Sequence, residues 1–104
     1  MNPSVRIDRG KIAEFCRKWK VTQLALFGSV LRDDFGPDSD VDVLVSFADE
    51  ARPGLFELCR MEDELRALFG RDVDLVTRKS VEQSRNYIRR KHILKHMETI
   101  HAAG

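Results

Sequence analysis

The chain has 104 residues, with 18 Lys and Arg against 17 Asp and Glu. Its length suits one domain, residues 1–104, and its 42% hydrophobic content argues against intrinsic disorder. The net charge of +1 gives no sign of general nucleic-acid binding, and we do not expect direct binding of that kind. The apolar runs fall far short of the ~18 residues of a membrane span, and the N-terminus lacks a signal-peptide core, so we expect a cytoplasmic protein.

The near-zero total hides a segregated charge pattern. Residues 1–32 carry seven basic and two acidic side chains, and residues 75–104 also carry seven and two. Residues 33–74, between them, carry four basic and thirteen acidic side chains. The middle of the chain is therefore where ligands for a cation would gather.

The first two predicted elements are a helix and a strand. Apolar residues recur at three- and four-residue spacing from Ile12 to Trp19, which predicts an amphipathic helix over about 8–19. Residues 22–27 are short, apolar and partly β-branched, which predicts a strand that ends in a turn at Gly28. A polar loop follows over 32–39.

The middle of the chain predicts a second strand and a long helix. Residues 40–47 alternate between a valine face and a face that carries Asp40 and Asp42. Pro53 suits the first turn of a helix, and Gly70 suits its end. We expect the buried stripe of this helix to comprise Leu55, Leu58, Met61, Leu65, Leu68 and Phe69.

The last third predicts a third strand and a helical region. Residues 72–77 have the strand pattern, and Ser80 with Gln83 has the spacing of a capping box at a helix start. The region that follows is one helix, or two with a break near Asn86. Its expected apolar stripe is Val81, Ser84, Tyr87 or Ile88, Leu94, Met97 and Ile100.

The resulting order is α, β, β, α, β, α. Two strands and a long loop precede the middle helix, which is not the order of a doubly wound sheet. We therefore predict an α+β (mixed α/β) fold, with a small three-stranded mixed sheet backed by helices.

The most informative residues are three aspartates on predicted strands. Asp40 and Asp42 are two positions apart on one strand, so their side chains share a face. Two close carboxylates repel unless a cation lies between them, and Mg²⁺ takes one or two carboxylates together with substrate phosphates. If the next strand is a neighbour, Asp74 brings a third carboxylate, and such a group can hold two ions for nucleotidyl transfer.

Gly28 and Ser29, which ten residues separate from Asp40, suit a phosphate group. A glycine at a strand end lets the backbone approach a phosphate closely, and the Ser29 hydroxyl can bond to a phosphate oxygen. Arg32 could grip a phosphate with two parallel hydrogen bonds. The plainer alternative is that the acids solvate an edge strand and the glycine makes a turn, but the combination favours phosphate and metal chemistry.

Residues 24–45, from Leu24-Ala-Leu-Phe-Gly-Ser29 to Asp40-Val-Asp-Val-Leu-Val45, resemble the signature of the DNA polymerase β-like nucleotidyltransferase superfamily. The small size and the remaining layout are similar to its minimal nucleotidyltransferase (MNT) branch, the MntA-type antitoxins. The resemblance implies the polymerase β-like fold in a single minimal domain, two Mg²⁺ ions and ATP as donor substrate. Such antitoxins are encoded with a HEPN-domain RNase toxin, so the resemblance implies transfer of AMP to a tyrosine of that toxin.

The same resemblance assigns roles to the motif residues. It implies that Gly28 and Ser29 hold the triphosphate and that Asp40 and Asp42 hold both metals. Asp74 would bind the catalytic metal and help to deprotonate the acceptor hydroxyl. Asp72 shares a face with Asp74 and is the alternative for that position.

Three further residues are candidates for nucleotide binding: Arg32, Ser39 and Arg85. Arg85 begins a run without acids between Glu82 and Glu98. This run is either a solvated helix face or a segment that contacts nucleotide phosphate or an acidic partner. Tyr87 is either a core residue or a platform on which a base stacks.

Two alternatives to protein adenylylation stay open. Many relatives have Arg-Gly where this chain has Arg32-Asp33, followed by Asp34. This departure and the charge segregation favour a catalytically weak or inactive antitoxin that neutralises the toxin by forming a complex. The other alternative is nucleic-acid tailing guided by the basic C-terminal region, which would require steeply salt-dependent RNA binding.

Two sequence features bear on the partner and the compartment. Only 27 residues follow Thr77, too few for an acceptor pocket, so we expect a partner protein to bring the acceptor hydroxyl. Cys16 and Cys59 lie on or beside apolar helical stripes and are interpreted as reduced packing residues.

Overall fold

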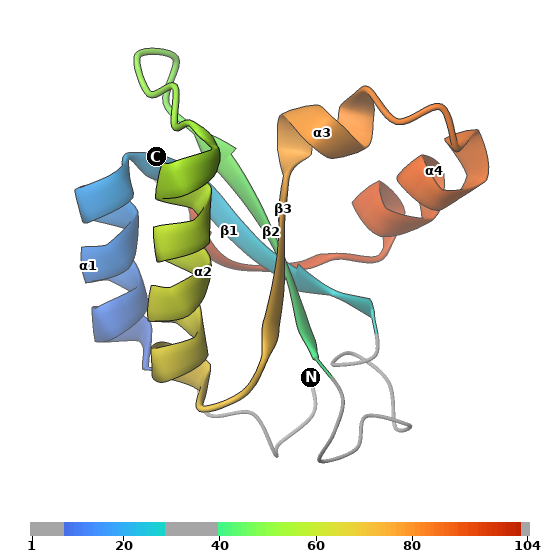
Figure 1. Cartoon of the computed structure of the whole chain (residues 1–104). Coiled ribbons are helices and arrows are strands. Elements are labelled where there is room, and N and C mark those ends of the chain that lie inside the picture. Colours follow the sequence, from blue (N-terminus) through green and yellow to red (C-terminus); the bar gives the residue numbers. More distant parts are fainter. Residues whose placement is uncertain (1–7, 29–39, 103–104) are drawn as a thin grey trace.

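The computed structural model describes residues 8–28 and 40–102. Figure 1 shows a sheet with helices on both of its sides, and the helices on one side are longer than those on the other. In chain order the elements are α1 (Arg9–Trp19), β1 (Val21–Phe27), β2 (Val41–Phe47), α2 (Leu55–Phe69), β3 (Val73–Thr77), α3 (Arg78–Glu82), α4 (Tyr87–Lys95) and β4 (Glu98–Ala102).

The sheet of the described residues has four strands in the order β3-β2-β1-β4. β1 is antiparallel to both β2 and β4, whereas β2 and β3 are parallel. The mixed α+β class is therefore confirmed. The predicted number of three strands is wrong because the chain ends in an additional strand, β4.

β4 occupies a stretch that the sequence pattern assigned to a helix. Met97 and Ile100 continued the three-residue spacing of Leu94, but α4 ends at Lys95 and Glu98–Ala102 pairs with β1. This pairing covers an edge of β1 that would otherwise present unpaired backbone groups. Ile100 is 5% exposed and joins the core, so tertiary pairing overrides the local helical spacing.

The main core lies between the sheet and the pair α1 and α2. The three valines of β2 contribute to it, as the alternation predicted, and so do Met61 and Leu65 of α2. Trp19 Nε1 of α1 donates a hydrogen bond of 2.6 Å to Glu64 of α2, and Lys18 forms an ion pair with the same carboxylate. These contacts join the two helices at the surface of the core.

A second, smaller core lies on the opposite face of the sheet. Leu44 of β2 and Phe27 of β1 pack there against Val81 of α3 and Ile93 of α4. Because side chains alternate along a strand, the face that carries Leu44 also carries Asp42. The second core therefore supports α3 and α4 on the side of the sheet where the aspartates lie.

The predicted end of α2 and the predicted break near Asn86 agree with the structure, whereas the predicted helix start at Ser80 does not. Gly70 ends α2 with a φ of 67°, and Asn86 caps the start of α4 by accepting a hydrogen bond from the Arg89 amide, so the break is confirmed. The predicted start at Ser80 is wrong. Thr77 caps α3 instead, and its hydroxyl accepts a hydrogen bond of 3.1 Å from the Ser80 amide.

Some predicted core residues are exposed. Leu55 is 79% exposed and Ile88 is 80% exposed, and Tyr87 is 59% exposed, so the assignment of these residues to buried stripes is wrong. Cys16 is buried as expected, whereas Cys59 is exposed. In the part of the chain that the structure describes, no helix combines the length and the apolar character that a membrane span requires.

Candidate active site

The centre of the candidate site is a pair of carboxylates on neighbouring strands. Asp42 of β2 and Asp74 of β3 are register partners in the parallel pair. Neighbouring strands lie about 4.8 Å apart, and partners in register project from the same face. Asp42 is half-buried and Asp74 is exposed, so the pair forms a negatively charged edge that solvent or a ligand can reach.

Gly28 completes this edge from the end of β1. Phe27 is the register partner of Asp42, which brings the next residue, Gly28, against the aspartate side chain. Gly28 has a φ of 77°, and a Cβ at this position would collide with Oδ2 of Asp42. The position therefore requires glycine both for its backbone conformation and for its close contact with the carboxylate.

Asp40 lies beside the pair without joining it. It precedes β2 by one residue, is exposed, and falls by alternation on the same face as Asp42. Across residues 8–28 and 40–102, no three His, Cys, Asp or Glu side chains lie close enough together to hold a metal ion. A cation bound between carboxylates offsets their mutual repulsion, so a bound metal ion would favour a closer approach of these side chains.

The donor chemistry of these residues nonetheless fits Mg²⁺. The available atoms are carboxylate oxygens, and Gly28 leaves no side chain between Asp42 and the end of β1. Mg²⁺ commonly binds one or two carboxylates and completes its shell with water and substrate phosphates. The Asp42–Asp74 pair supplies that number without a third protein ligand.

The other sequence-predicted positions fall into two groups. Ser29, Arg32 and Ser39 lie outside the described residues. Asp72 is exposed and lies just before β3, where its carbonyl oxygen accepts a hydrogen bond of 2.9 Å from the Val41 amide. That bond helps to set the register that pairs Asp42 with Asp74.

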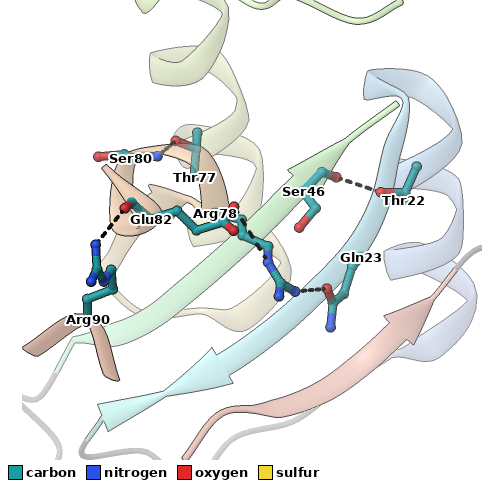
Figure 2. A network of polar contacts seen from close by, with 8 residues as sticks. All are labelled: Thr22, Gln23, Ser46, Thr77, Arg78, Ser80, Glu82 and Arg90. Atoms are coloured by element: carbon teal, nitrogen blue, oxygen red, sulfur yellow. Dashed lines mark hydrogen bonds and ion pairs between the residues drawn. The ribbon is translucent and has the colours of Figure 1, made fainter. Parts of the chain in front are cut away.

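A polar network holds α3 and α4 over this face of the sheet (Figure 2). Arg78, the first residue of α3, donates a hydrogen bond of 3.1 Å to the Gln23 side chain of β1. Arg90 of α4 donates one of 3.0 Å to the carbonyl oxygen of Glu82 at the end of α3. The two arginines therefore link the helices to each other and to the sheet.

A cavity of about 250 Å³ lies between α3, α4 and β3. Val76, two residues beyond Asp74 on the same face, forms part of its wall. Its polar lining comes from Ser80, Ser84, Arg89 and Arg90. The cavity thus places two guanidinium groups and two hydroxyls next to the strand that carries Asp74, an arrangement suited to part of a nucleotide.

Arg85, the arginine selected from the sequence, is exposed and does not line this cavity. Arg89 and Arg90 line it instead, because α4 begins at Tyr87 and turns these two positions toward α3. The signal in the sequence was the position of Asn86. Once Asn86 is the helix cap, the helical phase of the basic residues follows.

A larger cavity, of about 580 Å³, lies at the other end of β2 and β3, near Ser46 and Thr77. Asp42 lies near the first residue of β2, and Ser46 near its last, so this cavity is several residues away from the carboxylate pair. The larger of these two cavities therefore does not contain the carboxylate pair.

The fold is that of a nucleotide-transferring class of domain, as the comparison with known families shows. Residues 9–96 match the family of nucleotidyltransferase domains, and the chain belongs to this family. Within it, the relatives and the structural neighbours identify a minimal nucleotidyltransferase domain of the MntA type.

Two curated relatives illustrate the similarity. The protein adenylyltransferase MntA of Thermococcus cleftensis is 39% identical over 69 residues, which are 66% of this chain and 68% of the relative. A putative protein adenylyltransferase of Methanocaldococcus jannaschii is 38% identical over 64 residues, 62% of this chain and 64% of the relative. The matched stretch thus spans about two thirds of each relative's length.

Solved structures share the fold. A putative minimal nucleotidyltransferase superposes with a TM-score of 0.65 at 27% identity, over 86% of this chain and 85% of the other. A toxin–antitoxin complex with AMP-PNP gives 0.70 at 20% identity, over 93% and 75%. A complex of tri-AMPylated Shewanella oneidensis HEPN toxin with MNT antitoxin gives 0.60 at 20% identity, over 91% and 70%.

Proposed function

We propose that this protein is a Mg²⁺-dependent nucleotidyltransferase that transfers AMP from ATP to a tyrosine hydroxyl of a partner HEPN-domain RNase toxin, and thereby acts as an antitoxin. The observation that carries the proposal is the register pairing of Asp42 with Asp74 against Gly28. Relatives named protein adenylyltransferases and a structural neighbour that contains an AMPylated HEPN toxin support the reaction and the partner. Since ATP is the proposed donor, we place the protein in the cytoplasm.

Asp42 and Asp74 are the proposed metal ligands, with Asp40 as the third carboxylate. When bound, Mg²⁺ would neutralise charge on the triphosphate and orient it. Asp40 is exposed and shares the face of Asp42, so its side chain can approach the pair once a cation offsets the repulsion. Gly28 adds no side chain at the end of β1 next to Asp42, so its backbone is free for close approach by a phosphate, and Ser29, Arg32 and Ser39 are the proposed partners of the phosphates.

The proposed reaction transfers AMP from ATP to the acceptor oxygen and releases pyrophosphate and one proton. The acceptor oxygen forms a bond to the α-phosphorus of ATP, the bond between that phosphorus and the bridging oxygen to the β-phosphate breaks, and pyrophosphate leaves. Asp74, the exposed member of the pair, takes the proton of the acceptor hydroxyl. Arg89 and Arg90 in the neighbouring cavity, with Arg85 at the start of the basic segment, are the proposed contacts for the rest of the nucleotide.

The test uses ATP labelled on the α-phosphate, Mg²⁺ and the HEPN protein of the same host. We expect label on the HEPN protein with the wild-type chain, and at least a hundredfold less with Asp42→Asn, because that substitution removes a charge at the centre of the site. The matched control is Asp49→Asn, an exposed acid just beyond the other end of β2, which should label as the wild type does. ATP labelled on the γ-phosphate should leave the partner unlabelled, since pyrophosphate departs.

A second candidate is an antitoxin that neutralises its toxin by binding alone. Its support is the Asp33-Asp34 sequence in the expected triphosphate loop and the segregation of charge along the chain. The two candidates differ in whether substitution of the carboxylates abolishes protection against the toxin.

A further inference from the structure

Helix α4 has one face that is largely exposed, at whose edge Arg90 lies over the ring of Tyr87. Ile93 is its one buried residue, and Ile88 and Tyr87 are 80% and 59% exposed. An isolated helix of nine residues is unstable in water, and helices in proteins gain most of their stability from an apolar face that packs. With so little of α4 packed, its outer side is the place where further burial would occur.

The outer side forms one continuous stripe. Ile88, Lys91 and Lys95 are spaced by three and four residues, so they lie on one face of the helix, with Tyr87 at its edge. Arg89, Arg90 and Ile93 face the cavity on the opposite side. We define the α4 outer stripe as Tyr87, Ile88, Lys91 and Lys95, all of which are exposed.

The stripe belongs to the most basic part of the described chain. Arg89, Arg90, Lys91 and Lys95 give α4 four positive charges, and no acid occurs between Glu82 and Glu98. A positive field of this kind attracts an acidic surface and speeds encounter with it. Ile88 lies exposed on α4 next to Lys91 and Lys95. Burial of its aliphatic side chain against other apolar groups would be favourable, because it removes apolar surface from water.

We propose that the α4 outer stripe is the docking surface for an acidic surface of a partner protein, one that carries an apolar side chain to cover Ile88. The proposal rests on the proposed function in one respect: the partner is the HEPN protein that receives AMP. RNA would also be attracted by the lysines, but it offers no apolar pocket for an exposed isoleucine, so the stripe favours a protein.

The position of α4 is consistent with this use. Ile93 packs in the same small core as Leu44 and Phe27, on the face of the sheet where Asp42 and Asp74 lie. A partner held on the outer side of α4 is therefore on the same side of the sheet as the carboxylates. Figure 1 shows α3 and α4 together on this side, away from α1 and α2.

The test is the dissociation constant of the complex with the HEPN protein, measured by calorimetry. We expect Ile88→Glu to weaken binding at least tenfold, and the double variant Lys91→Glu with Lys95→Glu to do the same. The matched control is Leu55→Glu on α2, whose side chain is 79% exposed against 80% for Ile88, and it should bind within twofold of the wild type. ATP affinity without the partner should be unchanged in all variants, which shows that they are folded.

Each outcome decides the proposal. Wild-type affinity in Ile88→Glu, or no complex with the wild-type chain, overturns it. So does binding of a single-stranded RNA oligonucleotide that the double lysine variant abolishes while the HEPN complex persists. If Ile88→Glu breaks the complex but the wild-type chain transfers no AMP, the docking surface stands and the proposed reaction falls.

Discussion

The backbone of Gly28 lies directly against the carboxylate of Asp42, so that a single added methyl group would collide with Oδ2. The contact joins the end of β1 to the start of β2, because Phe27 and Asp42 are register partners in the antiparallel pair. Asp42 is paired on its other side with Asp74 of β3. One aspartate thus connects a glycine turn to a second carboxylate, and the proposed chemistry depends on this arrangement.

We expect Gly28→Ala to destabilise the fold more than Gly70→Ala does. Both glycines have positive φ, 77° and 67°, so both substitutions incur about 1–2 kcal/mol for the backbone conformation. A Cβ at Gly70 has no heavy atom within 4 Å, whereas one at Gly28 meets Asp42, which adds about 1–3 kcal/mol of overpacking. Urea denaturation measures both free energies of unfolding.

ATP binding provides the second readout for the same pair of variants. Gly28→Ala should displace the Asp42 side chain and weaken ATP binding, whereas Gly70→Ala should leave the dissociation constant unchanged. Equal losses of stability in the two variants, together with unchanged ATP affinity, would contradict the contact.

The strands that build the site could be predicted from the sequence, and the last strand could not. Residues 40–47 alternate so regularly that the face of Asp42 was predictable without a structure. At Glu98–Ala102 the local spacing of Met97 and Ile100 favoured a helix. The segment is a strand because it pairs with the edge of β1 that β2 leaves open. That edge is more than 70 residues away in sequence, beyond the reach of any local pattern.

Side-chain burial on the helices was harder to predict than the helices themselves. Leu55 and Ile88 fit apolar stripes, and each lies in the first turn of its helix, yet both are largely exposed. Similarly, Arg89 and Arg90 could be assigned to the cavity only after the start of α4 was known. Asp42 pairs with Asp74 because β2 and β3 are parallel neighbours. The sequence alone did not show that these two strands are adjacent.

The two cysteines should react at very different rates with iodoacetamide. Burial raises the pKa of the Cys16 thiol to about 11, so almost none of it is thiolate at neutral pH, and the side chain is 1% exposed. Cys59 is exposed on α2. Peptide mass spectrometry should find Cys59 modified in the native protein and Cys16 modified only in denaturant. Equal modification of both under native conditions would contradict the packing of α1.

The ion pair between α1 and α2 should make part of the stability depend on pH. Partial burial alone would raise the pKa of Glu64, but hydrogen bonds from Lys18 and Trp19 outweigh it and hold the pKa below its ordinary value of 4.5. The charged form is therefore favoured by folding. The stabilisation is fully present above pH 4.5 and is lost as the pH falls through the lower folded-state value.

Glu64→Gln tests this dependence. Since Lys18 is largely exposed, we expect the variant to lose up to about 1 kcal/mol at pH 7. Chemical denaturation of both proteins from pH 7 down to pH 3 should show the difference shrink at the acidic end. A difference that stays constant over that range would show that the charge of Glu64 contributes nothing.

Protection of cells separates the two candidate functions. We expect the double variant Asp40→Asn with Asp42→Asn to lose protection against the HEPN toxin while it still forms the complex, because transfer of AMP needs the carboxylates. Colony counts under toxin expression measure protection, and co-purification measures the complex. Full protection by the double variant would instead favour neutralisation by binding.

The most direct measurement of the central claim is the affinity for ATP with and without Mg²⁺, by calorimetry, in the wild-type chain and in the double variant Asp42→Asn with Asp74→Asn. If the paired carboxylates hold the metal that carries the triphosphate, Mg²⁺ should tighten ATP binding at least tenfold in the wild type and in the Asp49→Asn control. The same addition should have no effect in the double variant. A double variant that keeps the wild-type response to Mg²⁺ would contradict the account.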